Sequence, residues 1–322
     1  MNRDAIIRML GSDWTDCERF VREALRSDIA LLNRLNDGLL ENGGKQLRPM
    51  LSLLVARACG ACNDDSRRYA AAAELLHNAT LLHDDVADES ATRRNRPTLS
   101  ALMGPTTAVL VGDFWLAKVV GLVVSSQHHE SVIPLYAKTL SDLAEGEMFQ
   151  LEKAEKADTA EADYLHIVYG KTASLFETAC RAAALSADAP HHLVEAAGRY
   201  GAATGIGFQI RDDMLDYGTD GQTGKPVGSD LKEGKMTLPL IGALAGYPEE
   251  AALRGRIRQV AAHPDYCEEI RRFVLERGGL AYAAKRLDDY VQEALTALEV
   301  FPPSPERDAL EQLTRYNADR TR

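Results

Sequence analysis

Apolar residues recur at helical spacing in almost every segment between the glycine and proline breakers, and the alternation typical of strands is rare. No linker rich in Pro, Gly or Ser divides the chain. We therefore predict one all-α domain over residues 1–322. Its expected helices cover 28–40, 49–59, 69–88, 108–125 and 133–151, and residues 266–298 are expected to close the bundle.

Two other segments have a distinct pattern. The most apolar long window, Thr106 to Ser126, contains Asp113 and Lys118, so we expect a buried helix rather than a membrane span. Residues 152–163 are rich in Ala, Glu, Asp and Lys, and we expect them to form a solvated connector without a catalytic role.

Composition bounds the class of protein. The 322 residues are 45% hydrophobic and 26% charged, which is typical of a soluble globular chain with a sizeable core. The net charge of −11 argues against a nucleic-acid partner. The first residues form no long apolar stretch, and the odd number of cysteines, five, suits a reducing compartment, so we expect a cytoplasmic protein. Cys59 and Cys62 are expected to be structural, because no second pair completes a zinc site.

An acidic string lies near the end of the predicted helix 69–88. Asp84 and Asp88 stand one turn apart on a shared face, with Asp85 beside them. Like charges at this spacing cost a few tenths of a kcal/mol in an isolated helix, so the pair calls for a cation. Magnesium binds through one or two carboxylates, water and substrate phosphates. A solvated acidic face is the alternative for this string alone.

A second string with the same spacing strengthens the metal interpretation. Asp212, Asp213 and Asp216 lie on another apolar periodic segment, far along the chain. If the two helices face each other, six carboxylates converge on one cavity, and buried unpaired charges are too costly without a metal. Basic residues follow or precede both strings: Lys45 and Arg48, Arg93 and Arg94, and Lys225 and Lys235. Such clamps with magnesium suit a diphosphate ligand.

Four motifs in order resemble the trans-isoprenyl diphosphate synthases, in particular the medium- and long-chain polyprenyl type. They are GGKQLRP (43–49), HDDVADESATRRNRPT (83–98), GKTASLF (170–176) and GFQIRDDMLDYGTDGQTGKPVGSDLKEGKMTLP (207–239). Asn95 and Arg96 depart from the glycine and lysine usual in the family, although Arg96 keeps the charge. The resemblance implies the class I isoprenoid synthase fold, a helical bundle around a central apolar cavity. It also implies magnesium-dependent head-to-tail condensation of isopentenyl diphosphate with an allylic prenyl diphosphate.

The resemblance also assigns roles to residues. Three magnesium ions would bridge Asp84, Asp88 and Asp212 to the allylic diphosphate, with Asp85, Asp213 and Asp216 as the remaining candidate metal residues. The allylic diphosphate would also meet Arg93, Lys171, Lys225 and Lys235, whereas isopentenyl diphosphate would be held by Lys45, Arg48, His77 and Arg94. Lys171, Thr172 and Gln209 would lie near the allylic cation, and with Arg93 they form the expected catalytic set. His83 is expected to be structural, and Asp230 joins Lys225 and Lys235 in a lid.

Small residues before the first string bear on product length. In the family, bulky aromatic residues at these positions block the tunnel and give short products. Here the positions hold Ala79 and Thr80, followed toward the N-terminus by Leu76, Ala73 and Ala72. We therefore predict a product longer than geranylgeranyl diphosphate, used for quinone side chains, with a shorter-chain synthase as the alternative. The tunnel floor is left open between Phe114, Leu116 and other residues.

Other functions explain less of the sequence. A metal-dependent phosphohydrolase based on His83 and Asp84 leaves the second string without a role. A terpene cyclase binds no second diphosphate substrate, so it leaves GGKQLRP and the arginine pair unexplained. Non-catalytic subunits of heteromeric synthases usually lose one aspartate string, whereas this chain retains both. A homodimer is expected from the resemblance only. Transient membrane contact for product release is a further expectation, although no basic amphipathic helix supports it.

Overall fold

The computed structural model describes residues 3–41, 44–93, 96–218, 228–260 and 262–320. The chain forms two compact units, each assembled from three segments. The N-terminal unit consists of Met1–Ala137, Leu175–Gly198 and Ala297–Leu313. The C-terminal unit consists of Lys138–Ser174, Arg199–Thr296 and Thr314–Arg322. A single domain over residues 1–322 stays a prediction.

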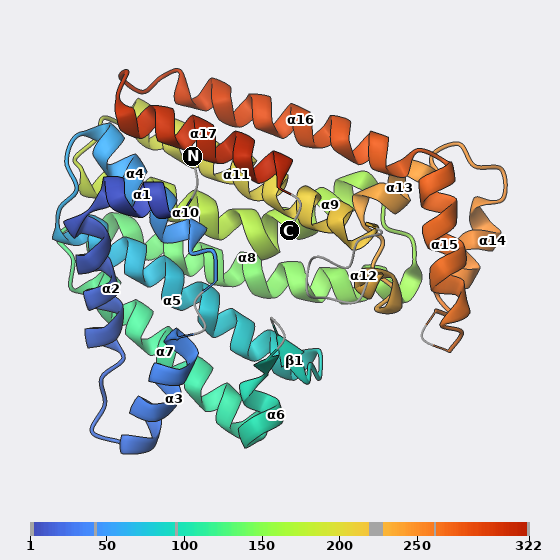
Figure 1. Cartoon of the computed structure of the whole chain (residues 1–322), viewed down its shortest axis with the longest axis horizontal. Coiled ribbons are helices and arrows are strands. Elements are labelled where there is room, and N and C mark those ends of the chain that lie inside the picture. Colours follow the sequence, from blue (N-terminus) through green and yellow to red (C-terminus); the bar gives the residue numbers. More distant parts are fainter. Residues whose placement is uncertain (1–2, 42–43, 94–95, 219–227, 261, 321–322) are drawn as a thin grey trace. The chain divides into compact units, whose positions relative to one another are not determined.

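The described residues are almost entirely helical, which confirms the all-α fold class (Figure 1). The first half of the chain contains α1 (Arg3–Leu10), α2 (Ser12–Ala24), α3 (Ala30–Leu40), α4 (Leu47–Cys59), α5 (Asp64–Ala87), β1 (Thr92–Arg93), β2 (Arg96–Pro97), α6 (Leu99–Met103), α7 (Pro105–Val124) and α8 (His129–Lys156). The second half contains α9 (Glu161–Val168), the π-helix η1 (Tyr169–Ala173), α10 (Ser174–Ser186), α11 (His191–Asp216), α12 (Ser229–Lys232), α13 (Leu238–Leu244), α14 (Glu250–Ile257), α15 (Asp265–Glu276), α16 (Gly279–Leu298) and α17 (Pro305–Asp319).

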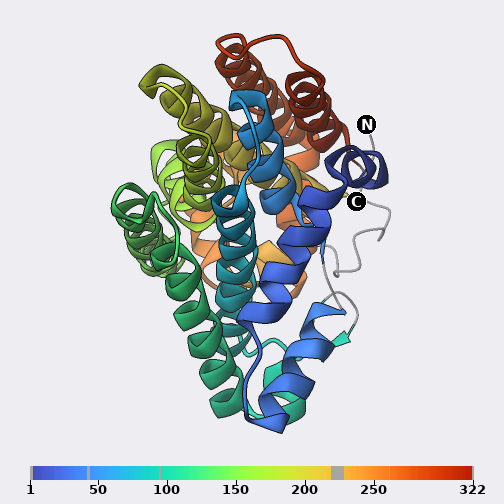
Figure 2. The same ribbon diagram turned by 90° about the vertical axis from the view of Figure 1, so that its left-hand side faces the viewer.

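The N-terminal unit is built around α5. Asn63 caps this helix by accepting a hydrogen bond from the Ser66 backbone N–H at 3.0 Å, and the run Ala70–Ala73 is fully buried. Small side chains let neighbouring helices approach closely, and α5 packs against α7, α4 and α2. Figure 2 shows α5 between α7 and α2. The packing fixes the direction in which the C-terminal turn of α5, with the first aspartate string, points within this unit.

Helix α7 has two different apolar faces. Its inner face, with Val111, Trp115 and Val119, is buried, and the indole N–H of Trp115 donates to Asn36 Oδ1 at 2.9 Å. Its outer face exposes Leu110 and Val120. Within the described part of the chain, α7 is the one helix long and apolar enough to span a membrane by length and composition, and 39% of its most apolar window is buried. The expectation of a buried helix therefore holds for one face only.

The C-terminal unit has two apolar cores. One lies under α13, α14 and α15 and includes Tyr217, Leu240 and Ile270. The other joins α9, α11 and α16 through Tyr164, Ile210 and other buried side chains. The Tyr164 hydroxyl also donates to Asp213, so α9 contacts the part of α11 that carries the second aspartate string.

Some sequence-based boundaries were wrong. Residues 152–163 are mostly helical, because α8 continues to Lys156 and α9 begins at Glu161. A Lys156–Glu152 ion pair one turn apart supports the end of α8, and Asp163 accepts from the Ala160 N–H at 3.0 Å at the start of α9. Residues 266–298, expected to close the bundle, lie in two helices, α15 and α16, which are divided at Gly278, where φ is +74°, a value that glycine adopts without strain. The strands Thr92–Arg93 and Arg96–Pro97 pair in addition, a feature that the apolar pattern did not indicate.

Candidate active site

The first aspartate string lies at the C-terminal end of α5. Asp85 is 5% exposed, and one of its carboxylate oxygens accepts a hydrogen bond from Arg93 Nε at 2.6 Å. Asp84 is half-buried and Asp88, the residue after the helix, is exposed. Asp85 therefore has a structural partner, whereas Asp84 and Asp88 lie one turn apart on the more accessible side.

A short hairpin positions Arg93. β1 and β2 pair with Arg93 opposite Arg96, and the Thr98 hydroxyl donates to the carbonyl of Ser90 at 2.7 Å. The hairpin thus turns the chain back toward the end of α5, where Arg93 meets Asp85. Arg94, predicted for isopentenyl diphosphate, lies outside the described residues, as does Asn95.

The basic residues of GGKQLRP flank the start of α4. Lys45 is exposed just before the helix. Arg48 is 9% exposed, and its guanidinium carbon lies 4.4 Å from the ring centre of Phe176, a residue of the GKTASLF motif. His77 is half-buried on α5, two turns before Asp84 and on nearly the same face. The N-terminal unit therefore contains four residues that we predicted to bind the two diphosphates: Lys45, Arg48, His77 and Arg93.

His83 contacts α7 rather than the aspartates. Its Nε2 atom lies 3.3 Å from the Val109 carbonyl and 3.4 Å from Asp113 Oδ1, and its ring lies where a Cβ on Gly112 would stand. These contacts agree with the structural role predicted for His83.

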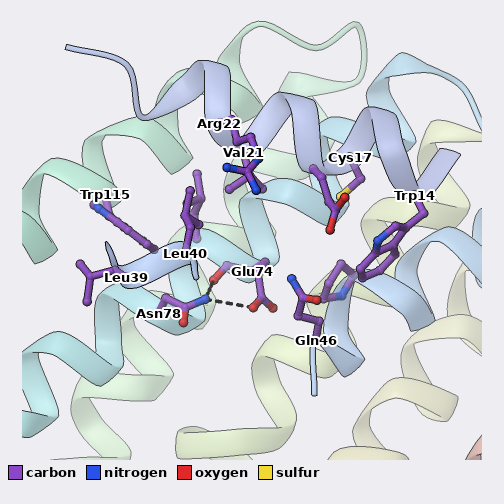
Figure 3. Close-up of a pocket in the computed structure, with 13 residues that line it drawn as sticks. Trp14, Cys17, Val21, Arg22, Leu39, Leu40, Gln46, Glu74, Asn78 and Trp115 are labelled. Atoms are coloured by element: carbon purple, nitrogen blue, oxygen red, sulfur yellow. Dashed lines mark hydrogen bonds between the residues drawn. The ribbon is translucent and has the colours of Figure 1, made fainter. Parts of the chain in front are cut away.

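A cavity of about 60 Å³ opens beside α5 in the same unit (Figure 3). Figure 3 shows Glu74 and Asn78 on its wall, where the Asn78 amide donates to a Glu74 carboxylate oxygen at 3.0 Å. Asn78 lies about 120° around the helix from Asp84. The cavity is therefore on a different face of α5 from the Asp84 and Asp88 pair.

The second aspartate string ends α11 in the C-terminal unit. Asp213 is 4% exposed and accepts from the Tyr164 hydroxyl at 2.6 Å and from Gln209 Nε2 at 2.8 Å. Burial raises the pKa of Asp213 well above its usual range, the Asp230 carboxylate raises it further, and the two hydrogen bonds oppose the shift. Asp213 thus belongs to the interior of this unit.

The third aspartate of this string holds the segment that follows. Asp216 accepts from the Ser229 backbone N–H at 3.1 Å, the Ser229 hydroxyl at 2.9 Å and the Asp230 backbone N–H at 3.1 Å. A carboxylate at the first turn of a helix satisfies N–H groups that have no partner inside it. Asp216 therefore anchors α12 to the end of α11.

The first aspartate of the second string has a different environment. The Asp212 side chain is 40% exposed, and Arg320 Nη2 lies 2.6 Å from Asp212 Oδ1. Asp212 is therefore accessible, in contrast to the buried Asp213, and it already bears a positive partner.

A hydrogen-bond chain links GKTASLF to the second string. The Thr172 hydroxyl donates to Gln209 Oε1 at 2.9 Å, and the Gln209 amide nitrogen donates in turn to Asp213. Lys171 Nζ forms an ion pair with Glu147 and donates to Gln150 Oε1 at 3.1 Å. The structure therefore brings Thr172, Gln209 and Asp213 together, whereas Lys171 is turned to α8.

The local fold that presents Lys171 and Thr172 is a π-helical turn. Single π-helical turns interrupt α-helices frequently at functional sites. Gly170 in η1 packs directly on α8, since a Cβ there would stand 2.6 Å from the Asp142 carbonyl oxygen and 3.2 Å from Gly146 Cα. The two glycines allow α8 and η1 to approach backbone to backbone.

The lid predicted around 225–235 is described in part. Lys235 is half-buried, forms an ion pair with Glu233, and donates its backbone N–H to the Asp230 carbonyl at 2.9 Å. Gly234 before it has φ +71°. Lys225 lies outside the described residues.

The donor chemistry of both strings fits a hard divalent cation. In each string one aspartate is buried against protein donors, Asp85 or Asp213, and another is accessible, Asp88 or Asp212. The Arg320 guanidinium shows that Asp212 accepts a positive charge in this position. Among the described residues no group of three or more His, Cys, Asp or Glu side chains is placed to hold a metal ion. Magnesium with few protein ligands, completed by water and phosphate, matches this arrangement.

Comparison with known proteins decides the family. A sequence profile described as polyprenyl synthetase matches residues 29–274. The chain belongs to the polyprenyl synthetase family. It is 40% identical over 319 residues to an all-trans-nonaprenyl-diphosphate synthase (geranyl-diphosphate specific) from Rhodobacter capsulatus, covering 98% of this chain and 97% of the relative. It is 36% identical to an octaprenyl diphosphate synthase from Escherichia coli (strain K12), covering 100% of both.

A solved structure extends the likeness to the fold. The crystal structure of a polyprenyl synthase from Caulobacter crescentus CB15, complexed with calcium and isoprenyl diphosphate, is 36% identical, with a TM-score of 0.90 and coverage of 100% of this chain and 98% of that chain. This chain is therefore a prenyltransferase with the all-α isoprenoid synthase fold. Its family uses isoprenyl diphosphates and a divalent metal.

Sequence reasoning missed several residues of the site. Glu147 and Gln150 hold Lys171, Tyr164 holds Asp213, and Arg320 holds Asp212. Glu147 and Gln150 share one face of a charged helix with ordinary spacing, and Arg320 lies in a tail without a motif. A hydroxyl directed at a buried carboxylate gives no periodic signal in a single sequence.

Proposed function

We propose that the chain is a long-chain all-trans polyprenyl diphosphate synthase. It condenses isopentenyl diphosphate head to tail with an allylic prenyl diphosphate, and its product serves as a precursor of quinone side chains. The observation that carries the proposal is the matched pair of aspartate strings, each with one buried and one accessible carboxylate, in a chain that also retains the basic motifs. Relatives named nonaprenyl and octaprenyl diphosphate synthase support the long product.

Each substrate diphosphate has its own set of residues in this proposal. Asp84, Asp88 and Asp212, with Asp85, Asp213 and Asp216 holding the strings in place, bind magnesium, for which the resemblance implies three ions. The allylic diphosphate also meets Arg93, Lys171, Lys225 and Lys235, and isopentenyl diphosphate meets Lys45, Arg48, His77 and Arg94. The bound ions supply positive charge to the leaving diphosphate.

The chain's own polar groups act on the allylic cation and on the formation of the new C–C bond. The allylic C–O bond breaks and its electron pair leaves with the diphosphate. The double bond of isopentenyl diphosphate then forms the new C–C bond, and a proton passes from the condensed product to the departed diphosphate. Thr172 and Gln209 present oxygen dipoles that stabilise the cation. Apolar walls exclude the water that would quench it.

The residues before the first string support a long tunnel. Ala79, Ala73 and Ala72 are fully buried and Thr80 is half-buried, and none carries an aromatic ring. At these four positions of α5, where an aromatic side chain would block the tunnel and shorten the product, the side chains are therefore small.

The exposed face of α7 supports a homodimer. Leu110 is 62% exposed, Val120 55% and Val124 50%, and Leu102 of α6 is 66% exposed. Apolar side chains clustered on one helix face mark an interaction surface. We propose that a second copy of this chain covers this face of α7. The dimer would act in the cytoplasm and would contact a membrane only transiently, when the product is released. Leu110→Glu should then give a folded monomer in size-exclusion chromatography with light scattering, and an unchanged mass would contradict this surface.

Incorporation of labelled isopentenyl diphosphate tests the function. With magnesium and an allylic primer, the chain should incorporate label, and Asp84→Asn and Asp212→Asn should each lower the rate by roughly 100-fold or more. Asp288→Asn, an exposed position on α16, is the control and should keep the rate. A folded wild-type chain that incorporates nothing would contradict the proposal and favour a non-catalytic subunit of a heteromeric synthase.

A further inference from the structure

The end of α17 carries a basic residue onto the second aspartate string. Arg320 Nη2 lies 2.6 Å from Asp212 Oδ1 and donates to the Phe208 carbonyl oxygen at 3.1 Å. The guanidinium carbon lies 4.2 Å from the centre of the Phe208 ring. The Arg320 side chain is 3% exposed, so its charge is held inside the C-terminal unit.

The backbone of Arg320 is fixed as well. Its carbonyl oxygen accepts from Arg211 Nε at 2.7 Å. Burial lowers the pKa of Arg211, and the Arg320 charge lowers it further. Phe208, Arg211 and Asp212 are three and four residues apart and share one face of α11. The last described residue of the chain is thus docked on the turn that carries Asp212.

This docking needs the Asp212 carboxylate. A buried guanidinium is costly unless a negative charge and hydrogen bonds compensate it. Arg320 Nε has no hydrogen-bond partner among the described residues, which leaves Nη2 to make the contacts to Asp212 and Phe208. The same carboxylate is the accessible member of its string, 40% exposed and suited to a divalent cation. A metal ion and a guanidinium at one carboxylate repel each other.

We propose that Arg320 is the counter-charge of Asp212 in the metal-free protein and competes with divalent metal for this carboxylate. Arg320 then sets the metal affinity of the second aspartate string. Metal binding with a diphosphate displaces the guanidinium and loosens the end of α17. The inference rests on the proposed function in one respect, that Asp212 binds metal.

Binding of Mn²⁺ to the full chain without substrate tests the competition. The free Mn²⁺ signal in electron paramagnetic resonance gives the affinity, and Arg320→Gln should bind roughly fivefold or more tightly than wild type. Arg320→Lys keeps the charge and should stay near wild type. Arg315→Gln, which removes the same charge from an exposed position on α17, should change nothing. A purely structural role for Arg320 would weaken binding or leave it unchanged, and either result overturns the proposal.

A second readout needs no variant. Hydrogen exchange of the peptide over 314–320 in wild type should become faster when Mn²⁺ and inorganic diphosphate are added. Slower or unchanged exchange there would contradict displacement. The two hypotheses fail separately: a wild-type chain that binds no Mn²⁺ and incorporates no isopentenyl diphosphate contradicts the function, whereas an active chain with unaltered Arg320→Gln affinity contradicts only this inference.

Discussion

The contact between η1 and α8 predicts that Gly170→Ala is harmful although alanine favours helices. A Cβ at Gly170 would stand 2.6 Å from the Asp142 carbonyl oxygen, and a backbone atom cannot rotate away. Ordinary C···O approaches begin near about 3.3 Å, so the two segments must separate by roughly 0.7 Å. This shift moves Lys171 and Thr172, the next two residues, relative to Gln150 and Gln209.

The expected magnitude follows from two opposing effects. Replacing glycine in a helix stabilises it by about 1 kcal/mol, whereas overpacking costs about 1–3 kcal/mol. The net loss is about 0–2 kcal/mol, which for a chain of 322 residues lowers Tm by at most roughly 3 °C. Activity should fall more steeply, since a displacement near 1 Å can cost roughly 100-fold.

Two assays separate these effects from a general glycine effect. Thermal unfolding should show Gly170→Ala no more stable than wild type, and label incorporation should fall at least about tenfold. Gly38→Ala is the matched control, because a Cβ on Gly38 meets nothing within 4 Å. It should be stabilised by about 0.5–1 kcal/mol with unchanged activity. A Gly170→Ala protein that is more stable than wild type and fully active would refute the close-packing argument.

Three further predictions concern other parts of the chain. Partial burial lowers the pKa of His128, but hydrogen bonds to Asp188 and Asp65 raise it above 6.5 overall. These contacts of His128 with the two aspartates, the His128 clamp, therefore stabilise the fold fully below pH 6.5, and their contribution weakens as pH rises through the raised pKa. Against His128→Gln, wild type should be more stable by less than about 1 kcal/mol below that pH in denaturant titrations, and a gap that widens at high pH would contradict the clamp. Tyr164→Phe removes the hydroxyl that donates to buried Asp213 and should cost about 1–3 kcal/mol of unfolding free energy, so an unchanged denaturation midpoint would show the bond to be unimportant. Thr80→Phe should shift the product to shorter chains while Thr80→Ser keeps its length, and identical product profiles would place the tunnel elsewhere.

Periodicity predicted the helices well where one face is apolar and breakers mark the ends. The α4, α5 and α7 segments appear within a few residues of their expected bounds, except that α5 begins at Asp64 rather than near Tyr69. The five extra residues are all polar, and the Asn63 cap that precedes them acts through local hydrogen bonds that an apolar pattern does not register.

The aspartate strings illustrate what spacing alone conceals. Identical spacing placed Asp85 and Asp213 beside the other candidates, but burial gives both a protein partner, Arg93 for one and Tyr164 with Gln209 for the other. Which carboxylate turns inward depends on what packs against the helix. That information lies in distant segments such as α9, so a single sequence could name the string and not the division of roles within it.

The length of the product tests the long-chain assignment most directly. The purified chain is incubated with labelled isopentenyl diphosphate, farnesyl diphosphate and magnesium, and the dephosphorylated products are resolved by chain length. A long-chain synthase should give a ladder that ends beyond the geranylgeranyl product. Termination at the farnesyl or geranylgeranyl length would contradict the long-chain assignment and the open path beside Ala79 and Thr80.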